Sequence, residues 1–290
     1  MWQWLRFPNS KTRVMASPKW SLTEHLLSNF QSEYITATQH PFLLAAAEGR
    51  LPKDVLGRWL ANDRLYIHSY IRAAGKLLSS IDLPQEVPKT EAPETQLVDW
   101  LIEALGGVRK EERFFIEVAD RYGLGVELGQ TGVGAASSVV HDEKLPGLVM
   151  IEGIFSDIAQ PQGGFTTAEL PPTDPLPWLE GAVTFWGTER CYLDAWSWAK
   201  SKQALATSGS DARNDADGGA LRNEFIPNWS SSEFAQFVGR LGSLIDFAVA
   251  QTLERAGDGA DAAKEAIIGR IEGKWRSLLA AEATFWPEFE

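Results

Sequence analysis

The sequence predicts an all-α protein built as a single-domain helical bundle. Most apolar residues recur three or four positions apart, which is the spacing of helices with one buried face. No stretch bounded by turn signals alternates apolar and polar residues as a strand would. With 44% hydrophobic residues among 290, the chain can bury a substantial core. We expect about eight helices from these spacings.

The first expected helical face lies between Leu22 and Tyr34 and ends at His40-Pro41, because a residue before proline is kept out of the α region. A long helix starts at Pro52, where a missing N–H does no harm, and ends near Ser80. A linker rich in proline and acids follows. The apolar spacing then predicts two shorter helices, over 97–105 and 114–122, separated by Gly106-Gly107.

The second half alternates loops and helices. Residues 125–138 are glycine-rich and 160–177 proline-rich, so we expect loops on either side of a helix over 145–158. Another helix covers 178–200, and the Ser-, Asp- and Gly-rich segment 201–222 is expected to be mobile. Ser230-Ser231-Ser232-Glu233 reads as a capping box opening a helix, and a last helix follows Gly259.

The charge disfavours two classes of partner. The chain has 27 basic and 39 acidic residues and a net charge of −12, which argues against a nucleic-acid surface and against attraction to anionic lipid. No apolar run approaches the roughly 18 residues of a membrane span. The single cysteine, Cys191, excludes an intramolecular disulfide and suits a reducing compartment. We therefore expect a cytoplasmic protein with no nucleic-acid or membrane partner.

The first 20 residues form a basic leader. They contain Arg6, Lys11, Arg13 and Lys19, and no acid precedes Glu24. Mitochondrial import is therefore an alternative to the cytoplasm, although the amphipathic Arg/Ser pattern of a transit peptide is missing. We expect an unstructured leader over 1–20 and the helical domain over 21–290.

Three predicted helices each carry one acid on an otherwise apolar, aromatic-rich face. Asp63 comes four residues after Trp59, Glu189 fills the same kind of gap on the helix over 178–200, and Glu282 comes four residues after Leu278. An ionised carboxylate costs several kcal/mol to bury unless it is paired or hydrogen-bonded. Each of the three acids therefore needs a partner or a ligand.

If the three faces meet in one core, their acids line an aromatic pocket suited to a flat, polar molecule. Crowding would raise the pKa of at least one acid toward neutrality, as general acid/base catalysis requires. The alternative is structural: each acid is bonded to Arg, Tyr or backbone, and Tyr66, Tyr70 and Tyr192 are core residues. A dimetal site would need Glu-x-x-His pairs, and no histidine stands three after a glutamate. We expect no metal or other cofactor.

Several segments resemble one known family in order and spacing. They are His40-Pro41-Phe42, then Gly49 to Pro52, then Trp59-Leu60-Ala61-Asn62-Asp63-Arg64-Leu65-Tyr66, then Ile226 to Phe234, and finally Glu282-Ala283-Thr284-Phe285-Trp286. Together they resemble TenA proteins, the thiaminase II-like group of the haem-oxygenase-like fold. The likeness runs from about residue 21 to 288, with loop insertions at about 125–177 and 201–222.

The resemblance implies roles for individual residues. Asp63 and Tyr66 would hold an aminopyrimidine, and Glu282 would act in acid/base chemistry. Glu189 stands where the better-known branch has a nucleophilic cysteine, which resembles the glutamate-type branch. That branch hydrolyses amino- and formylamino-pyrimidines from degraded thiamin to hydroxymethyl pyrimidine. A tyrosine that the family places in the pocket from the middle helix is missing, and Trp229 replaces another.

We therefore predict an aminopyrimidine hydrolase of thiamin salvage. Glu189 and Glu282 are its expected catalytic acids, and the expected substrate-binding residues are Asp63, Tyr66, Tyr70, Tyr192 and Trp229. The family further implies a homodimer or homotetramer. Two alternatives stay open, a non-catalytic pyrimidine-binding or regulatory protein on the same fold and a metal-dependent oxidase of the same superfamily.

Overall fold

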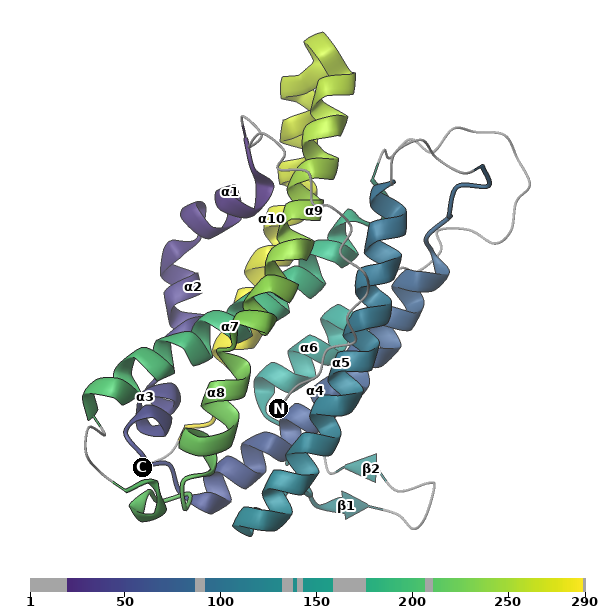
Figure 1. The fold of residues 1–290 in the computed structure, drawn as a ribbon. Coiled ribbons are helices and arrows are strands. Elements are labelled where there is room, and N and C mark those ends of the chain that lie inside the picture. The colour runs from purple at the N-terminus through teal and green to yellow at the C-terminus, as the bar shows by residue number, and fades with distance from the viewer. Residues whose placement is uncertain are drawn as a thin grey trace.

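The structure, a computed structural model, describes residues 20–86, 92–131, 138–139, 143–158, 176–206 and 211–288. These residues form ten α-helices, several short 3₁₀ and π turns and one pair of two-residue strands around one hydrophobic core (Figure 1). The all-α prediction is confirmed. The expected leader, apart from Trp20, lies outside the described residues.

The first four helices follow the predicted boundaries closely. The face predicted from Leu22 is split at Phe30 into α1 (Leu22–Asn29) and α2 (Gln31–Thr38). Helix α3 (Pro41–Ala47) starts with proline in its first turn and is capped by the His40 side chain, which accepts a hydrogen bond from the Phe42 N–H. Helix α4 (Lys53–Ser79) is the long helix that the sequence predicts.

Helix α5 (Pro93–Tyr122) corrects one prediction. The sequence indicates two helices separated at Gly106-Gly107, but α5 runs unbroken through both glycines. A glycine in a helix interior costs about 1 kcal/mol, and packing of α5 against α4 and α9 outweighs that cost. The helix ends where expected, at Gly123, whose φ of +65° suits glycine.

Between α5 and α7 lie a strand pair and one helix. Strand β1 (Gln130–Thr131) pairs antiparallel with β2 (Ser138–Val139) near one end of α4 and α5 (Figure 1). Helix α6 (Pro146–Ser156) then packs along α4.

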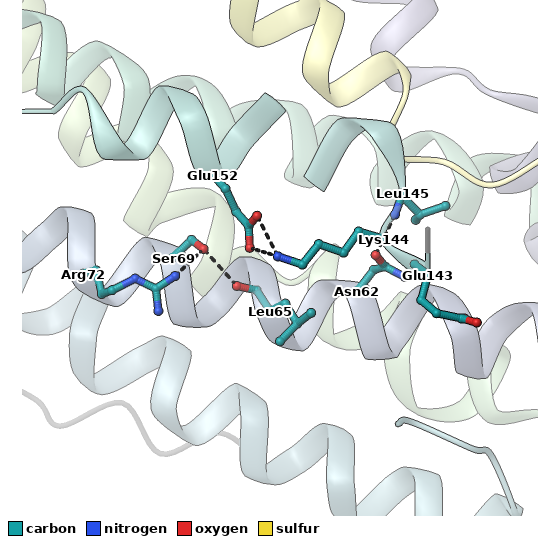
Figure 2. A network of polar contacts seen from close by, with 8 residues as sticks. All are labelled: Asn62, Leu65, Ser69, Arg72, Glu143, Lys144, Leu145 and Glu152. Atoms are coloured by element: carbon teal, nitrogen blue, oxygen red, sulfur yellow. Dashed lines mark hydrogen bonds and ion pairs between the residues drawn. The ribbon is translucent and has the colours of Figure 1, made fainter. Parts of the chain in front are cut away.

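Figure 2 shows the polar contacts that join α4 to the start of α6. The buried Asn62 accepts a hydrogen bond from the Leu145 N–H at 2.8 Å and donates one to the Arg58 carbonyl at 3.0 Å. Lys144 binds Glu152 at 2.7 Å along α6. Because Asn62 precedes Asp63, these contacts fix the part of α4 that carries the first inward acid.

Helix α7 (Leu179–Ala206) contacts α2, α3, α8, α9 and α10 and so lies at the centre of the bundle. The following segment was expected to be mobile, but its described part is ordered. Asp217 is 1% exposed and accepts hydrogen bonds from the N–H groups of Gly219 and Leu221. A π-helical turn (Leu221–Phe225) then leads directly into α8 (Ile226–Trp229), which positions Trp229.

The last two helices pack along each other and project from one end of the bundle in Figure 1. Helix α9 (Ser232–Ala256) is capped by Ser231, whose hydroxyl accepts a hydrogen bond from the Phe234 N–H. The predicted capping box is therefore one residue out of register, and Glu233 does not close it. Helix α10 (Ala260–Ala283) begins after Gly259, as predicted.

Candidate functional site

The three inward acids each accept a hydrogen bond from a tyrosine on another helix. Tyr66 of α4 donates to Glu282 of α10 at 3.1 Å, and Tyr70 of α4 donates to Glu189 of α7 at 2.7 Å. In the opposite direction, Tyr192 of α7 donates to Asp63 of α4 at 3.1 Å. The structure thus brings together six of the seven residues that the sequence singles out, as three acid–tyrosine pairs linking α4 to α7 and α10.

Burial in the core disfavours the ionised form of all three acids and so raises their pKa values. Asp63 is 4% exposed and Glu282 is 2% exposed, whereas Glu189 is partly exposed. Burial raises the pKa of Glu189 and of Glu282 to about 8, in spite of the tyrosine hydrogen bonds that favour their charged forms. Burial, with the nearby charges of Glu111, Glu282 and Glu189, raises the pKa of Asp63 well above its ordinary value. At neutral pH Glu189 and Glu282 are mostly protonated.

A fourth acid, Glu111 of α5, belongs to the same cluster and was missed by the sequence prediction. It accepts a hydrogen bond from the indole N–H of Trp229 at 2.7 Å, and burial raises its pKa to about 7. The signal was present, since Glu111 comes three after Val108 and four before Phe115 on the buried face of α5. The sequence prediction ended one helix at Gly106-Gly107 and began the next at residue 114. Glu111 therefore lay in neither predicted helix, and its spacing from Val108 and Phe115 was not used.

Aromatic rings surround the acid–tyrosine pairs. Phe155 of α6 packs edge-on against Tyr66 and Tyr70, and Phe185 lies 4.7 Å from the Tyr70 ring. Helix α6 therefore contributes a phenylalanine to this cluster. On the other side, Tyr192 packs edge-on against Trp229, with ring centroids 5.3 Å apart.

A small cavity adjoins the cluster. Its volume is about 40 Å³, and its walls include Glu111 and Glu189 with Asn228 and Trp229 of α8. Because a cavity of about 150 Å³ accommodates a benzene-sized ring, a pyrimidine fits here only if the packed aromatic side chains move. Asp63, Tyr66, Tyr70, Tyr192 and Glu282 are not among the residues that line this cavity. Of the predicted site residues, Glu189 and Trp229 do line it.

A larger, open groove of about 720 Å³ lies between α7 and the start of α9. Its walls carry both signs of charge, including Arg190, Asp194 and Lys200, and several serines. None of the predicted site residues lines this groove. It shares Ser231 with the small cavity and so lies next to it.

The core also holds the one cysteine of the chain. Cys191 is 2% exposed, and burial raises the pKa of its thiol well above the ordinary value, so it stays protonated. Over the described ranges, no group of three or more His, Cys, Asp or Glu side chains is arranged to hold a metal ion. In the same ranges, no helix has the length and apolar character required to cross a membrane.

The fold and its acid-lined aromatic core define an all-helical protein with the fold of TenA homologues. The TenA homologue of Pyrococcus furiosus has a TM-score of 0.57 and 18% identity, covering 91% of this chain and 97% of that one. A TenA homologue from Pseudomonas syringae has a TM-score of 0.59 and 9% identity, covering 98% of each chain. A TenA family transcription regulator from a Silicibacter species has a TM-score of 0.59 and 14% identity, covering 94% of this chain and 97% of that one.

One segment of the chain also matches a sequence family. Residues 27–91, which include Asp63, Tyr66 and Tyr70, match the TENA/THI-4/PQQC family. A protein of Fusarium pseudograminearum described as a probable transcription factor is 26% identical over 270 residues. That alignment covers 89% of this chain but 51% of the fungal protein, so the chain spans about half the length of this relative.

Proposed function

We propose that the protein hydrolyses aminopyrimidines in thiamin salvage, converting aminomethyl or formylaminomethyl pyrimidine to hydroxymethyl pyrimidine. The observation that carries this proposal is the set of three acid–tyrosine pairs, whose carboxyls have raised pKa values inside an aromatic core. Groups with pKa values near the working pH are suited to proton transfer in catalysis.

Asp63 is the group proposed to recognise the ring. In its protonated form its O–H donates to a ring nitrogen while its carbonyl oxygen accepts from the neighbouring amino group, which matches the edge of an aminopyrimidine. Tyr192 donates to the same carboxyl and fixes its orientation. Tyr66, Tyr70 and Trp229 would offer ring faces for stacking once the aromatic side chains admit the substrate.

Glu189 and Glu282 are the proposed acids of the reaction. Cleavage of the C–N bond at the pyrimidine methylene needs a proton on the leaving nitrogen and an activated water. A carboxyl with a pKa of about 8 is protonated at neutral pH and can deliver that proton, and its conjugate base can accept one in return.

A chromatographic assay with aminomethyl pyrimidine, its N-formyl derivative and thiamin tests the proposal. We expect hydroxymethyl pyrimidine from at least one of them, and we expect Glu189→Gln and Glu282→Gln to lose turnover with unchanged circular dichroism. The matched control is Glu265→Gln, an exposed glutamate on α10 outside the cluster. Full turnover in both cluster variants would refute the assigned roles.

A regulatory role is the second candidate, because two of the similar proteins are described as a probable transcription factor and as a TenA family transcription regulator. The net charge of −12 disfavours direct contact with DNA, so this role would consist of sensing a pyrimidine. Saturable pyrimidine binding, measured by calorimetry, without product from any of the three compounds would favour it over hydrolysis.

A further inference from the structure

We propose that Glu111 is a further catalytic residue of this site, and that it holds and deprotonates the attacking water in the small cavity beside Glu189. This inference rests on the proposed hydrolase function. It assigns to α5 a part in the chemistry that none of the predicted site residues gives it.

The cavity has the size and polarity of a water site. A volume of about 40 Å³ exceeds the roughly 10–15 Å³ that one water needs, and a buried water makes two to four hydrogen bonds. Glu111 approaches from α5, Glu189 from α7 and Asn228 from α8, so three polar side chains of different helices line one small space. Ser231 adds a fourth polar side chain, and the remaining walls are largely apolar, including Ala104, Val108, Phe234 and Phe237.

The electrostatic contacts make Glu111 part of the acid cluster. The charge of Glu111 raises the pKa values of Glu189 and Asp63. Glu282 also acts on Asp63, and Glu189 raises the pKa of Glu282. The four acids therefore act on one another within one cluster. A proton can be taken from water by one acid of the cluster and given to the leaving nitrogen by another.

The surroundings of Glu111 favour its role as the base. Its pKa of about 7 is lower than the values of about 8 for Glu189 and Glu282, and the Trp229 indole stabilises its charged form. The titratable groups facing it are Asp63 and Tyr70 of α4 with Glu189 and Tyr192 of α7. From α9 the cavity receives only phenylalanines, Phe234 and Phe237, so no cation competes for Glu111 there.

The step balances in atoms and charge. The water oxygen forms a bond to the pyrimidine methylene carbon as its proton passes to Glu111. The C–N bond breaks, and its electron pair leaves with the amine nitrogen, which takes the proton of Glu282. The products are the hydroxymethyl pyrimidine and ammonia, or formamide from the formylated substrate. Exchange with solvent then returns Glu111 and Glu282 to their starting protonation states.

The test compares Glu111→Gln, Glu111→Asp and the control Glu117→Gln, which changes an exposed glutamate of the same helix. Removing a general base typically costs about 10²–10⁴ in rate. We expect kcat to fall at least 100-fold in Glu111→Gln with KM changed less than about threefold, partial recovery in Glu111→Asp, and wild-type kcat in the control. The acidic limb of the wild-type kcat profile, with an apparent pKa of about 7, should disappear in Glu111→Gln.

The results separate this inference from the proposed function. A wild-type protein that turns over substrate while Glu111→Gln keeps both its kcat and its acidic limb would overturn the role of Glu111 alone. No turnover by wild type with any of the three compounds would overturn the hydrolase function and this role together.

Discussion

Replacing Glu282 by glutamine should make the protein more stable, by an amount that grows with pH. Glu282 is 2% exposed and its pKa is raised by burial from 4.5 to about 8. Between these values the unfolded chain releases its proton while the folded protein keeps it, so stability falls as pH rises. The penalty is absent well below pH 4.5 and complete above pH 8. Glutamine has the same shape, can still accept the Tyr66 hydrogen bond and carries no charge to desolvate.

The size of the effect follows from the two pKa values. Each pKa unit corresponds to about 1.4 kcal/mol, so the wild-type penalty is about 1 kcal/mol at pH 5, about 3 kcal/mol at pH 7 and about 5 kcal/mol at pH 9. Urea denaturation followed by tryptophan fluorescence at these three pH values measures it. We expect the stability difference between Glu282→Gln and wild type to increase by several kcal/mol from pH 5 to pH 9.

Glu265→Gln is again the control, because it removes the same charge from the exposed side of α10. It should change stability by less than about 0.5 kcal/mol at each pH, as exposed substitutions usually do. A stability difference for Glu282→Gln that is the same at pH 5 and pH 9 would show that the carboxyl is not held protonated by the fold, and the reasoning about the whole acid cluster would fail with it.

Three further substitutions probe the supports of the site. Tyr192→Phe removes the hydrogen bond to Asp63. It should weaken pyrimidine binding, measured by calorimetry, about fivefold to tenfold. An unchanged affinity would show that this hydrogen bond plays no part in pyrimidine recognition. Asn62→Ala leaves the Leu145 N–H without its buried acceptor. It should lower the free energy of unfolding by about 1–3 kcal/mol in urea titrations. A loss below about 0.5 kcal/mol would contradict the anchoring role of Asn62. Gly147→Ala places a methyl group against the backbone of Ala281 and Phe285. It should lower the melting temperature markedly in calorimetry. A wild-type melting temperature would show that α6 is free to shift.

Helical spacing was sufficient to predict the fold class and the inward acids. Asp63 and Glu282 interrupt apolar faces so regularly that their burial follows from position alone, and the structure finds both below 5% exposed. The partners could not be predicted in the same way. Which tyrosine meets which acid depends on the crossings of α4, α7 and α10, and those crossings are set by packing over the whole core.

Two predictions were wrong because tertiary contacts override the local sequence signals on which they rested. Gly106-Gly107 reads as a helix end, but α4 and α9 hold α5 straight through it, and Glu111 was lost with that reading. The composition of residues 201–222 reads as mobile, yet Asp217 ties its described part through two buried hydrogen bonds. Composition indicates how a segment behaves in isolation. It cannot indicate that a single side chain of the segment becomes buried in the fold and orders it.

The pairing of acids with tyrosines restricts how the site can change over evolutionary time. Loss of the carboxyl at residue 189 leaves the buried Tyr70 hydroxyl without its acceptor, and loss of Tyr70 removes the hydrogen bond that the Glu189 carboxyl accepts. Single replacements that leave no hydrogen-bonding group at one of the two positions are therefore costly, and such exchanges should occur at both positions together in descendants of a common ancestor. Relatives with an apolar residue at 189 should lack the hydroxyl at 70, and the same rule should hold for Tyr66 with Glu282 and for Tyr192 with Asp63.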